Sequence, residues 1–354
     1  MRTYFITGGC GFIGSNFIHH LIKNKFATKI INLDKLTYAG NRENLFSVED
    51  NEDYFFIKGD ISDQKVVRNI LKEYKPDTIV NFAAESHVDR SIDRPIDFIR
   101  TNVLGTLNLL SESNHWLNNI ENPTAKDFKF IHISTDEVYG SLGRKGKFTE
   151  NTPYDPSSPY SASKASSDHL ARSWYKTYNF PVIITNCSNN YGPYQFPEKL
   201  IPLMIINALT GKKLPIYGKG SNVRDWLYVD DHCKAIQAII ESGRLGQTYN
   251  IGGNNEITNI KIVETICEIL DHEIPLEDGK LYNEGIVFVD DRPGHDFRYA
   301  IDATKIEKEL GWKPKENFKT GIKKTILWFL RNKDWWRKIQ REKYNQERLG
   351  ALKL

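Results

Sequence analysis

The sequence predicts an α/β fold in which a doubly wound parallel sheet is followed by a smaller C-terminal lobe. Three observations support this fold. Short apolar segments alternate with longer helical patterns through the first half of the 354-residue chain, as expected for βαβ units. The first apolar segment runs directly into a glycine-rich turn. After residue 189 the alternation stops, and proline, glycine and aromatic residues follow one another closely.

The first half supplies the elements of the predicted sheet. We expect strands at residues 4–7, 29–33, 54–57, 78–82, 130–134 and 182–186. The intervening patterns predict helices at residues 14–25, 64–74, 95–116 and 159–178, the first of which begins inside the glycine turn. Strands that alternate with helices in this way form a parallel sheet covered on both faces.

The second half predicts the smaller lobe. Helix and strand patterns become shorter after residues 191–197, and the segments 226–231 and 248–252 are expected to return to the sheet. The last segment, residues 331–354, is charged and carries Trp335 and Trp336. It is expected to be either a docked helix or a mobile tail.

Composition and charge indicate a small-molecule partner. Lys and Arg number 48 and Asp and Glu 45, for a formal net charge of +3, so no strong field favours nucleic acid. The cysteines Cys10, Cys187, Cys233 and Cys267 are widely separated, and neither they nor the histidines show metal-ligand spacing. No segment has the apolar length of a membrane span or the pattern of a cleaved signal. We therefore expect a reduced, cytoplasmic protein that needs no metal or membrane.

The glycine-rich turn predicts a dinucleotide site. Gly8, Gly11 and Gly14 follow the first predicted strand and open the first predicted helix, where glycines let the backbone approach a pyrophosphate. Asp34 ends the next strand, twenty residues after Gly14, and can accept hydrogen bonds from a ribose. A carboxylate there repels a 2′-phosphate and favours NAD over NADP, although the neighbouring Lys35 weakens this preference. Asp60 could contact adenine or serve only as a turn residue.

Two further motifs suggest the chemistry. Tyr160 and Lys164 are four positions apart, which on a helix places them on one face. A phenol has a pKa of about 10 and becomes a useful base only beside a cation, which Lys164 and an oxidised nicotinamide can supply. Asp136 and Glu137 follow the strand at 130–134 directly. Adjacent carboxyls at that strand end suggest that a carbon–oxygen bond is also broken, provided that the backbone turns so that both can reach the substrate.

These motifs together resemble the extended short-chain dehydrogenase/reductase family, which binds NAD on a Rossmann-like fold and acts on nucleotide sugars. Further segments are similar to the dTDP-glucose 4,6-dehydratases within it, and the similarity covers nearly the whole chain. They are residues 36–41 (LTYAGN), 83–91 (AAESHVDRS), 188–193 (SNNYGP), 224–229 (RDWLYV) and 291–296 (DRPGHD). Cys10 departs from the small apolar residue usual in the family, but it is similarly small.

The resemblance implies a three-step lyase reaction on dTDP-glucose. Tyr160 would take the proton of the C4 hydroxyl, which Thr135 positions, as hydride passes to NAD. Glu137 would then remove the C5 proton while a protonated Asp136 protonates the departing C6 hydroxyl. Hydride finally returns to C6, so NAD is regenerated. The product, dTDP-4-keto-6-deoxyglucose, would enter deoxysugar biosynthesis, with dTDP-rhamnose as the expected pathway.

The resemblance also implies the binding residues and the domain division. The expected cofactor-binding residues are Gly8, Gly11, Phe12, Ile13, Gly14, Asp34, Lys35, Thr37, Gly40, Asp60, Ile61, Ala83, Ala84, Ser86, Thr101, Tyr160, Lys164 and Asn190. The expected substrate-binding residues are Ser86, Thr135, Asn189, Lys199, Leu200, Pro215, Tyr217, Arg224, Asn259, Arg292 and His295. Residues 1–188 would form the NAD-binding domain, with returning segments near 225–255, and residues 189–330 mainly the substrate-binding lobe.

Two other functions stay open at this point. A nucleotide-sugar 4-epimerase shares the fold, NAD and the Tyr/Lys pair, but it needs neither Asp136 nor Glu137. A non-catalytic NAD-binding regulator would not require Tyr160, Lys164 or Glu137. The preference for dTDP over other nucleoside diphosphates rests on the resemblance, as does the expectation of a homodimer joined through the helices after Pro95 and Pro159.

Overall fold

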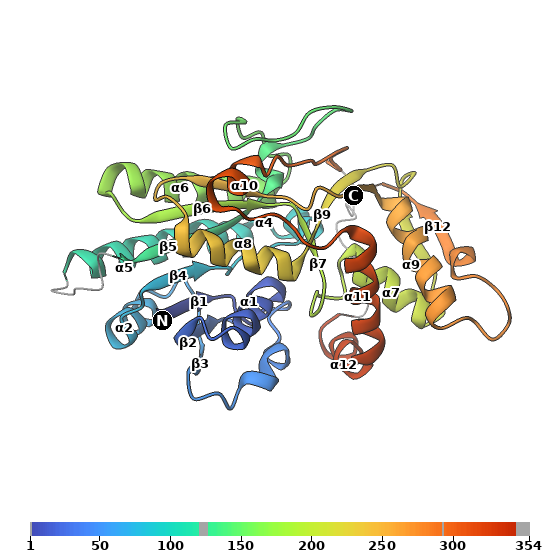
Figure 1. Ribbon diagram of the computed structural model, residues 1–354, viewed down its shortest axis with the longest axis horizontal. Helices are drawn as coiled ribbons and strands as arrows, with labels where there is room; N and C mark the ends of the chain where they lie inside the picture. The colour runs from blue at the N-terminus through green and yellow to red at the C-terminus, as the bar shows by residue number, and fades with distance from the viewer. Residues whose placement is uncertain (1, 120–126, 292–293, 345–354) are drawn as a thin grey trace.

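The large sheet of the first lobe has seven parallel strands in the order β10-β6-β5-β4-β1-β2-β3. The computed structural model describes residues 2–119, 127–291 and 294–344 (Figure 1). The strands of this sheet are β1 (Arg2–Thr7), β2 (Ala27–Asp34), β3 (Tyr54–Lys58), β4 (Thr78–Asn81), β5 (Lys129–Thr135), β6 (Val182–Cys187) and β10 (Thr248–Ile251). The strand order reverses between β1 and β4, which confirms the predicted doubly wound fold.

Helices cover both faces of this sheet. On one face, α1 (Phe12–Lys23) packs beside α8 (Val229–Ser242), and on the other lie α2 (Gln64–Tyr74), α5 (Thr106–Asn118) and α6 (Pro159–Tyr178). The buried side chains that join the sheet to these helices include Phe17, Ile18, Ile236 and Ile239 on the first face and Val67, Leu71, Leu109 and Ala171 on the second. The sheet is therefore buried on both sides, as parallel sheets generally are.

Local signals explain why two predicted helices have the expected bounds. Asp63 caps α2 by accepting hydrogen bonds from the first-turn N–H groups, and Ser158 caps α6, whose first residue is Pro159. Each helix ends at a residue with positive φ, Lys75 (46°) and Asn179 (53°). The caps at both ends are encoded close to the helix itself, so the local sequence is sufficient to predict them.

The prediction of one continuous regular helix at residues 95–116 is wrong. Three consecutive pieces replace it: α4 (Pro95–Phe98), the π-helical segment η2 (Ile99–Gly105) and α5. A Cβ on Gly105 would lie 2.6 Å from Ile61 Cδ1, so the wide turn passes close to the cofactor side of the sheet. π-Helical turns occur often at functional sites, and Thr101 in this one lines the cavity described below.

Within the described residues, the second lobe contains two small sheets with helices packed beside them. β7 (Asn189–Tyr191), β9 (Val223–Tyr228) and β11 (Glu256–Thr258) form one sheet, and β8 (Leu214–Tyr217) and β12 (Ile286–Val289) form the other. Its core joins α7 (Leu200–Leu209), α9 (Asn259–Glu273) and α11 (Phe318–Arg331) through Met204, Ile205, Ile262, Ile266, Ile322 and Phe329. The lobe lies beside the C-terminal edge of the first-lobe strands (Figure 1).

Only one of the two predicted returns to the large sheet is made by a strand. Residues 248–252 contribute β10, but the segment at 226–231 does not add a strand there. Its first part belongs to β9, which pairs with β7 and β11, and its second part begins α8. Asp225 holds β9 in the small sheet by accepting hydrogen bonds from the N–H groups of Gly253 (2.9 Å) and Asn255 (2.7 Å).

The described part of the C-terminal segment is a docked helix. α12 (Lys333–Glu342) follows α11 and buries Trp336, whose Nε1 donates to Phe329 O at 3.0 Å. Residues 345–354 lie outside the described residues, so the alternative of a mobile tail is not tested for them. The helices α10 (Thr304–Leu310), α3 (Val88–Asp93), η1 (Arg42–Val48), η4 (Asp136–Tyr139) and η5 (Tyr282–Gly285) complete the chain.

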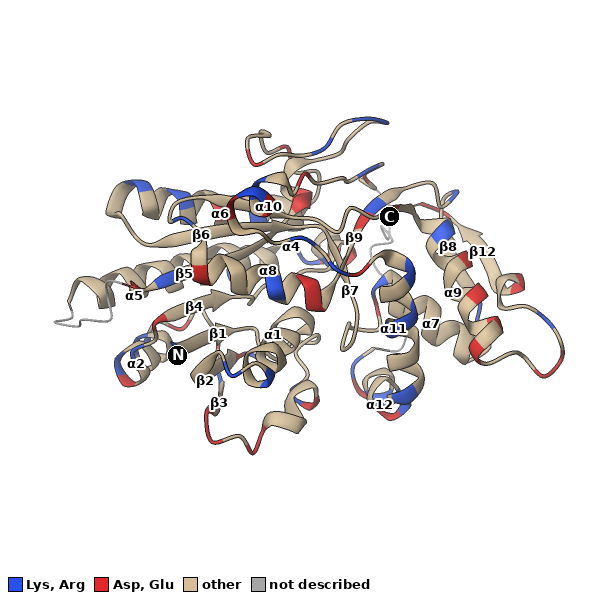
Figure 2. Ribbon diagram, viewed as in Figure 1, with Lys and Arg blue, Asp and Glu red and all other residues tan. Residues whose placement is uncertain are grey.

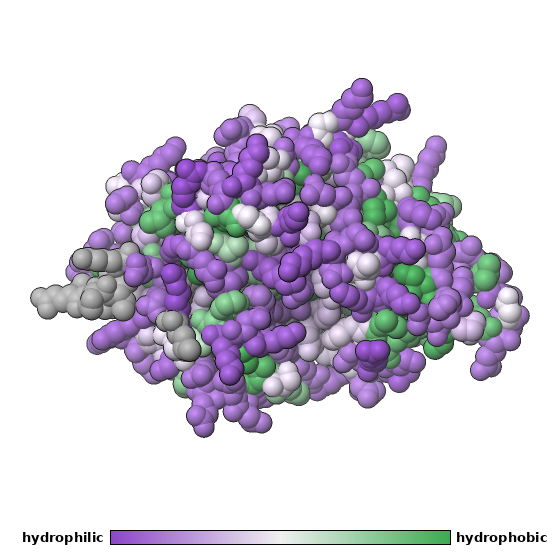
Figure 3. All heavy atoms as spheres, viewed as in Figure 1, coloured by the Kyte–Doolittle hydropathy of each residue, from purple (hydrophilic) through white to green (hydrophobic). Residues whose placement is uncertain are grey.

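The outer surface is largely polar on the face shown in Figure 3, where hydrophobic residues occur in small separate groups. Within the described ranges, no helix is both long and apolar enough to cross a membrane.

Candidate active site

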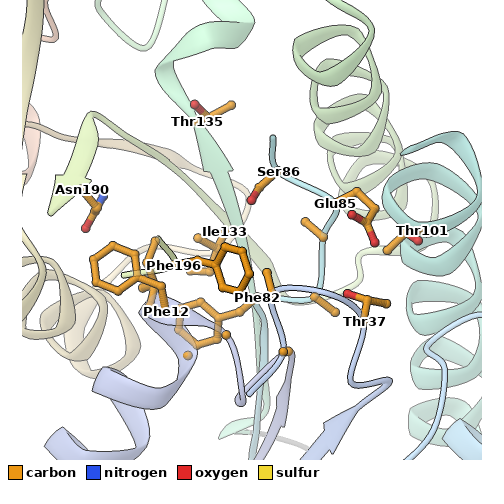
Figure 4. A pocket seen from close by; sticks show the side chains of 18 of the residues that line it. Phe12, Thr37, Phe82, Glu85, Ser86, Thr101, Ile133, Thr135, Asn190 and Phe196 are labelled. Atoms are coloured by element: carbon orange, nitrogen blue, oxygen red, sulfur yellow. The ribbon is translucent and has the colours of Figure 1, made fainter. Parts of the chain in front are cut away.

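A cavity of about 290 Å³ lies at the carboxyl ends of the central strands. Its walls come from the turn after β1, the loop after β2, the ends of β4, β5 and β6, and the first turns of α6. In Figure 4, Thr135 and Thr37 lie on opposite sides of this space, and Phe12, Phe82 and Phe196 lie together at its lower left. Ligands of doubly wound sheets bind at this position. All residues expected to bind the cofactor or to act in catalysis line the cavity.

The glycine turn has no room for side chains. Gly8 has φ of +69°, and a Cβ there would lie 2.6 Å from Ala83 N; a Cβ on Gly14 would lie 2.5 Å from Gly8 O. Gly11 stands at the N-cap of α1 and provides no side-chain cap to the first-turn N–H groups. The positive end of the helix and these N–H groups therefore face the cavity, as a bound pyrophosphate requires.

Backbone hydrogen bonds hold the Asp34 carboxylate at the end of β2, in an orientation that fits a ribose. One carboxylate oxygen accepts from Cys10 N at 2.9 Å, and the other accepts from Leu36 N at 2.7 Å. Burial raises the pKa of this carboxyl, and the two N–H groups oppose that rise. The carboxylate lies beside Gly40, whose Cβ would approach it to 2.9 Å. Both oxygens are thus oriented by the backbone toward the cofactor end of the cavity.

Lys35 and Asp60 form an ion pair of 2.7 Å at the same end. Asp60 also accepts from Ser62 N at 2.9 Å, which is the turn role considered above. Because Lys35 is paired with Asp60, its charge is partly balanced and adds little attraction for a 2′-phosphate. The residues present therefore fit NAD, with glycines for the diphosphate and a carboxylate for the ribose.

The backbone turns directly after β5, as the chemistry requires of the two adjacent carboxyls. Thr135 caps the short helix η4, and its Oγ1 accepts from Glu137 N at 3.3 Å. The same hydroxyl donates to Asp136 Oδ1 at 3.4 Å. Because η4 replaces the extended backbone, Asp136 and Glu137 both line the cavity instead of pointing to opposite sides of a strand.

The surroundings of Asp136 favour its protonated form. The residue is 1% exposed, and its Oδ2 has no hydrogen-bond partner within the described part of the chain. Burial raises the pKa of Asp136 well above its usual value, and the nearby carboxyls of Glu137 and Asp225 raise it further. Asp136 is therefore suited to donate a proton, while Glu137 is only partly buried.

Tyr160 and Lys164 project from the first turns of α6. The Tyr160 ring packs edge-on against Phe98 with ring centroids 6.2 Å apart, and Lys164 Nζ donates to Ile133 O at 2.7 Å. Burial raises the pKa of Tyr160 well above its usual value, as do Glu137 and Cys187. Burial and these negative neighbours thus favour the protonated phenol. Positive charge must come close before Tyr160 can act as a base, and Lys164 and oxidised nicotinamide are its sources.

A buried polar network lies one helical turn beyond Lys164. Asp168 Oδ2 accepts hydrogen bonds from Ser134 Oγ and Tyr154 OH, both at 2.9 Å, and its Oδ1 lies 3.2 Å from His132 Nε2. Burial alone would raise the pKa of Asp168, but these partners and Lys164 bring it below its usual value. Burial lowers the pKa of Lys164, and the negative Asp168 opposes this fall. Sequence reasoning did not include Asp168, although positions 160, 164 and 168 share one helix face.

The residues expected to bind substrate divide into two groups. Ser86, Thr135, Asn189 and Lys199 line the cavity. The others are on the second lobe: Leu200 at the start of α7, Pro215 and Tyr217 in β8, Arg224 in β9, Asn259 at the start of α9 and His295 in the loop after β12. Arg292 lies outside the described residues.

Contacts within the second lobe bring several of these residues together. The rings of Tyr217 and His295 are 6.2 Å apart edge to face. Arg224 donates to Asp296 O at 2.9 Å and stacks 4.2 Å from the centroid of Tyr299. The buried Arg224 guanidinium thus lies against the Tyr299 ring and is bonded to the backbone of the residue that follows His295.

The cavity also includes residues that the sequence analysis did not single out. They are Leu33, Ala39, Gly59, Phe82, Glu85, Ile133, Ser134, Cys187, Ser188, Gln195, Phe196 and Glu198. Glu198 accepts from Arg90 Nε at 3.0 Å, and the Arg90 guanidinium stacks 3.8 Å over the ring of Tyr38. Glu85 and Phe196 lie inside or beside motifs noted above, but nothing in their spacing showed that they face the cavity.

Comparisons with known proteins show which family the chain is similar to. Residues 5–325 match the model of a family described as GDP-mannose 4,6 dehydratase. A dTDP-glucose 4,6-dehydratase of Xanthomonas campestris pv. campestris (strain B100) is 54% identical over 351 residues, 99% of each chain.

Two solved structures are also similar. One is a dTDP-glucose 4,6-dehydratase from Bacillus anthracis in complex with NAD, with 48% identity and a TM-score of 0.85 over 96% of this chain and 100% of the other. The second comes from Streptomyces venezuelae, also with NAD bound, with 44% identity and a TM-score of 0.87 over 95% of this chain and 99% of the other. The sequence, fold and cavity thus agree, and the chain belongs to the dTDP-glucose 4,6-dehydratase family.

Proposed function

We propose that this protein is an NAD-dependent lyase that converts dTDP-glucose to dTDP-4-keto-6-deoxyglucose and water. The observation that carries the proposal is the turn at η4, which brings Asp136 and Glu137 into the same cavity as Tyr160 and Lys164. Oxidation and reduction at one carbon need only the last two residues. Elimination of water needs an acid and a base in addition, and the turn supplies both.

NAD, when bound, accepts a hydride from C4 of the hexose and later returns it to C6. The residues of this chain manage the protons. Tyr160 takes the proton of the C4 hydroxyl, and the hydroxyl of Thr135 positions that group. The C4 ketone makes the C5 hydrogen acidic, so Glu137 can remove it. Asp136 gives its proton to the C6 oxygen, which leaves as water, and the carboxyls return a proton to C5.

The division of labour between the two carboxyls follows from their environments. Asp136 is buried with two other carboxyls nearby, so one proton is retained there. Glu137 is half-buried at the rim of the turn, where an ionised form is better solvated. Two titratable groups with different surroundings can therefore serve as acid and base at the same pH.

Cations near both lobes support binding of the substrate diphosphate. Lys199 lines the cavity and donates to Ser86 O at 2.9 Å, which holds it at the boundary between the lobes. Arg224 is only 6% exposed and lies beside Tyr299. Its guanidinium suits a bidentate phosphate contact. We propose that these residues, with Asn189, Leu200, Pro215, Tyr217, Asn259, Arg292 and His295, bind the sugar nucleotide, and that thymidine is its nucleoside.

A homodimer is part of this proposal. The segment after Pro95 exposes three large hydrophobic side chains, Ile96 (54%), Ile99 (42%) and Leu104 (50%). A partner copy that packs on this segment would remove them from water. The cytoplasmic location and the entry of the product into dTDP-rhamnose synthesis stay predictions.

Product analysis in heavy water tests the reaction. Incubation with dTDP-glucose should yield the 4-keto-6-deoxy sugar with deuterium at C5, because Glu137 exchanges its proton with solvent before the proton returns. Nuclear magnetic resonance reports both the C6 methyl group and the isotope. Formation of dTDP-galactose without loss of the C6 hydroxyl would instead support a 4-epimerase and contradict the proposal.

A further inference from the structure

We infer that the C-terminal segment from Lys333 to Tyr344 is a positioning element of the NAD site, which holds the ribose-binding loop 36–44 in its binding conformation. The inference rests on the proposed function for the identity of the cofactor. It goes beyond that function because α12 contributes no residue to the cavity and takes no part in the chemistry. Figures 1 and 2 show α12 as a charged helix on the side of the second lobe that faces the N-terminal segment.

Three polar contacts join this segment to the loop and its extension. Trp335 Nε1 donates to Asn44 Oδ1 at 2.8 Å, and Lys343 Nζ donates to Gly40 O at 2.7 Å. Lys338 forms an ion pair with Glu43. The partners are separated by roughly 300 positions in sequence, so tertiary folding alone brings them together.

The same loop is tied directly to the cofactor-binding backbone. Asn44 Nδ2 donates to Cys10 O at 3.1 Å, and Asn41 N donates to the same oxygen at 2.9 Å. Cys10 N in turn donates to Asp34. The chain of contacts therefore runs from Trp335 through Asn44 to the glycine turn and the ribose carboxylate.

An apolar cluster supports the loop from its other side. Ile339 and Tyr344 pack with Phe196, and Tyr38 and Ala39 of the loop lie against this group. Phe196 itself lines the cofactor cavity, and its ring lies 5.5 Å from that of Tyr38. Burial of these side chains links the C-terminal segment, the loop and the cavity wall in one hydrophobic contact.

The loop and α12 do not pack continuously, so the contacts named above are what joins them. A second cavity of about 380 Å³ lies between them, lined by Leu36, Gly40, Asn41, Arg42, Glu43, Phe46, Glu49, Lys338, Ile339, Glu342 and Lys343. Trp335 packs edge-on against Trp328 of α11, with ring centroids 5.0 Å apart, and Trp336 donates a hydrogen bond to Phe329 O. The C-terminal segment is thus fixed on the second lobe and reaches the loop at a few points.

These contacts to the loop predict an effect on NAD affinity. A loop that is already ordered loses little conformational freedom when NAD binds, so affinity is higher than for a mobile loop. Lys343 also places a cation near Asp34. Burial lowers the pKa of Lys343, and the negative charge of Asp34 opposes that fall. Loss of the contacts should mobilise the loop and weaken NAD binding without altering Tyr160, Asp136 or Glu137.

The test compares the double variant Trp335→Phe plus Lys343→Met with the control Lys323→Met. Lys323 lies on α11, pairs with Glu273 at 2.8 Å and takes no part in the contacts to the loop named above. Bound NAD is measured by extraction from protein purified under identical conditions, and its dissociation constant by titration after the cofactor is stripped. We expect the double variant to bind NAD about tenfold more weakly, which corresponds to a loss of about one ordered contact pair. The control should retain wild-type affinity.

The outcomes separate this inference from the proposed reaction. A dissociation constant within twofold of wild type in the double variant would overturn the positioning role, whatever the product of the enzyme. Weaker NAD binding in the double variant, together with a wild-type protein that forms no dehydrated sugar, would leave the inference intact and contradict the reaction. If the double variant does not fold, the single change Trp335→Phe keeps the ring in place and removes only the hydrogen bond, with about threefold weaker binding expected.

Discussion

At the scale of single residues, function depends on which groups hold protons. Asp136 is buried beside Glu137, and Tyr160 is buried beside both. The position of each on the chain identifies it as a candidate, but the difference in pKa between them follows from solvation and neighbours. Substitutions at these positions should therefore interrupt different steps of one reaction.

The variants Glu137→Gln and Tyr160→Phe should stall at different points. Glu137→Gln lacks the base for C5 but retains Tyr160, so oxidation at C4 should still occur and reduced cofactor should accumulate on the enzyme. Tyr160→Phe cannot take the C4 proton, so reduced cofactor should not form. Absorbance at the NADH band after mixing with dTDP-glucose distinguishes them, and overall turnover should fall about a hundredfold or more in each. Accumulation of equal amounts of reduced cofactor in both variants would disprove the assigned roles.

The variant Asp168→Asn should shift the alkaline limb of the pH profile to lower pH. The negative charge of Asp168 raises the pKa of Lys164, which burial lowers. Without that charge, Lys164 loses its proton at lower pH, and activity that requires the cation falls earlier as pH rises. The other charged or titratable groups near Lys164 are Tyr160, Cys187 and His132.

Turnover measured across pH under saturating substrate checks this expectation. Glu264→Gln is a matched control, because Glu264 is a partly exposed carboxylate on α9 that pairs with Lys261. An unchanged alkaline limb in Asp168→Asn would show that Lys164 does not depend on this carboxylate. The buried substitution should also lower the free energy of unfolding by about 1–3 kcal/mol, since hydrogen bonds to a charged acceptor are lost.

At the scale of elements, the site is built where strands give way to turns. The β1–α1 turn makes room for a diphosphate, and the β5–η4 turn aims two adjacent carboxyls at one cavity. α6 presents Tyr160, Lys164 and Asp168 along one face from a helix start fixed by its capping box. Each element supplies geometry that single residues do not have by themselves.

The variant Gly14→Ala should damage the β1–α1 turn. Its Cβ would meet Gly8 O at 2.5 Å and Gly9 Cα at 2.8 Å, and both contacts are with backbone that cannot rotate away. The turn must move, so NAD affinity should fall more than tenfold and stability by about 1–3 kcal/mol. Gly143→Ala is the control, since a Cβ there has no neighbour within 4 Å. Titration with NAD and thermal unfolding measure both effects, and equal behaviour of the two variants would contradict this account of the turn.

At the scale of the whole molecule, two lobes with separate cores meet around one cavity. The sheet lobe buries its strands under α1 and α8 on one face and α2, α5 and α6 on the other, and the second lobe has its own core around α7, α9 and α11. The C-terminal segment joins the second lobe to the loop beside Asp34. Exposed apolar residues after Pro95 leave one surface of the assembled chain suited to a second copy.

The variant Leu104→Glu should weaken the proposed dimer. Light scattering of the wild-type protein should give twice the mass of one chain, and a charge introduced at the centre of an apolar contact should move the equilibrium toward monomer. Phe288→Glu is the matched control, because Phe288 is 60% exposed on β12 in the second lobe. A monomeric wild type, or equal loss of mass in both variants, would rule out this surface as the contact.

The sequence was sufficient for features that depend on neighbouring residues. The bounds of α2 and α6 follow from caps next to the helices, and the glycine turn, Asp34 and the Tyr160/Lys164 pair follow from short-range spacing. The break of the predicted helix at 95–116 could not be read in the same way, because its π-helical segment adapts to Ile61 from a different element. The placement of β9 likewise depends on Asp225 and its partners beyond residue 252.

By itself, then, the sequence determined the fold class, the family and the residue types that carry the chemistry, since these are written in local patterns and motifs. Only the tertiary structure decided that Asp136 is buried beside other carboxyls, that Asp168 lies beneath Lys164 and that the C-terminal helix reaches the loop beside Asp34. The physical reason is that solvation, electrostatic coupling and packing depend on distance in space. Those distances join positions that the chain separates widely.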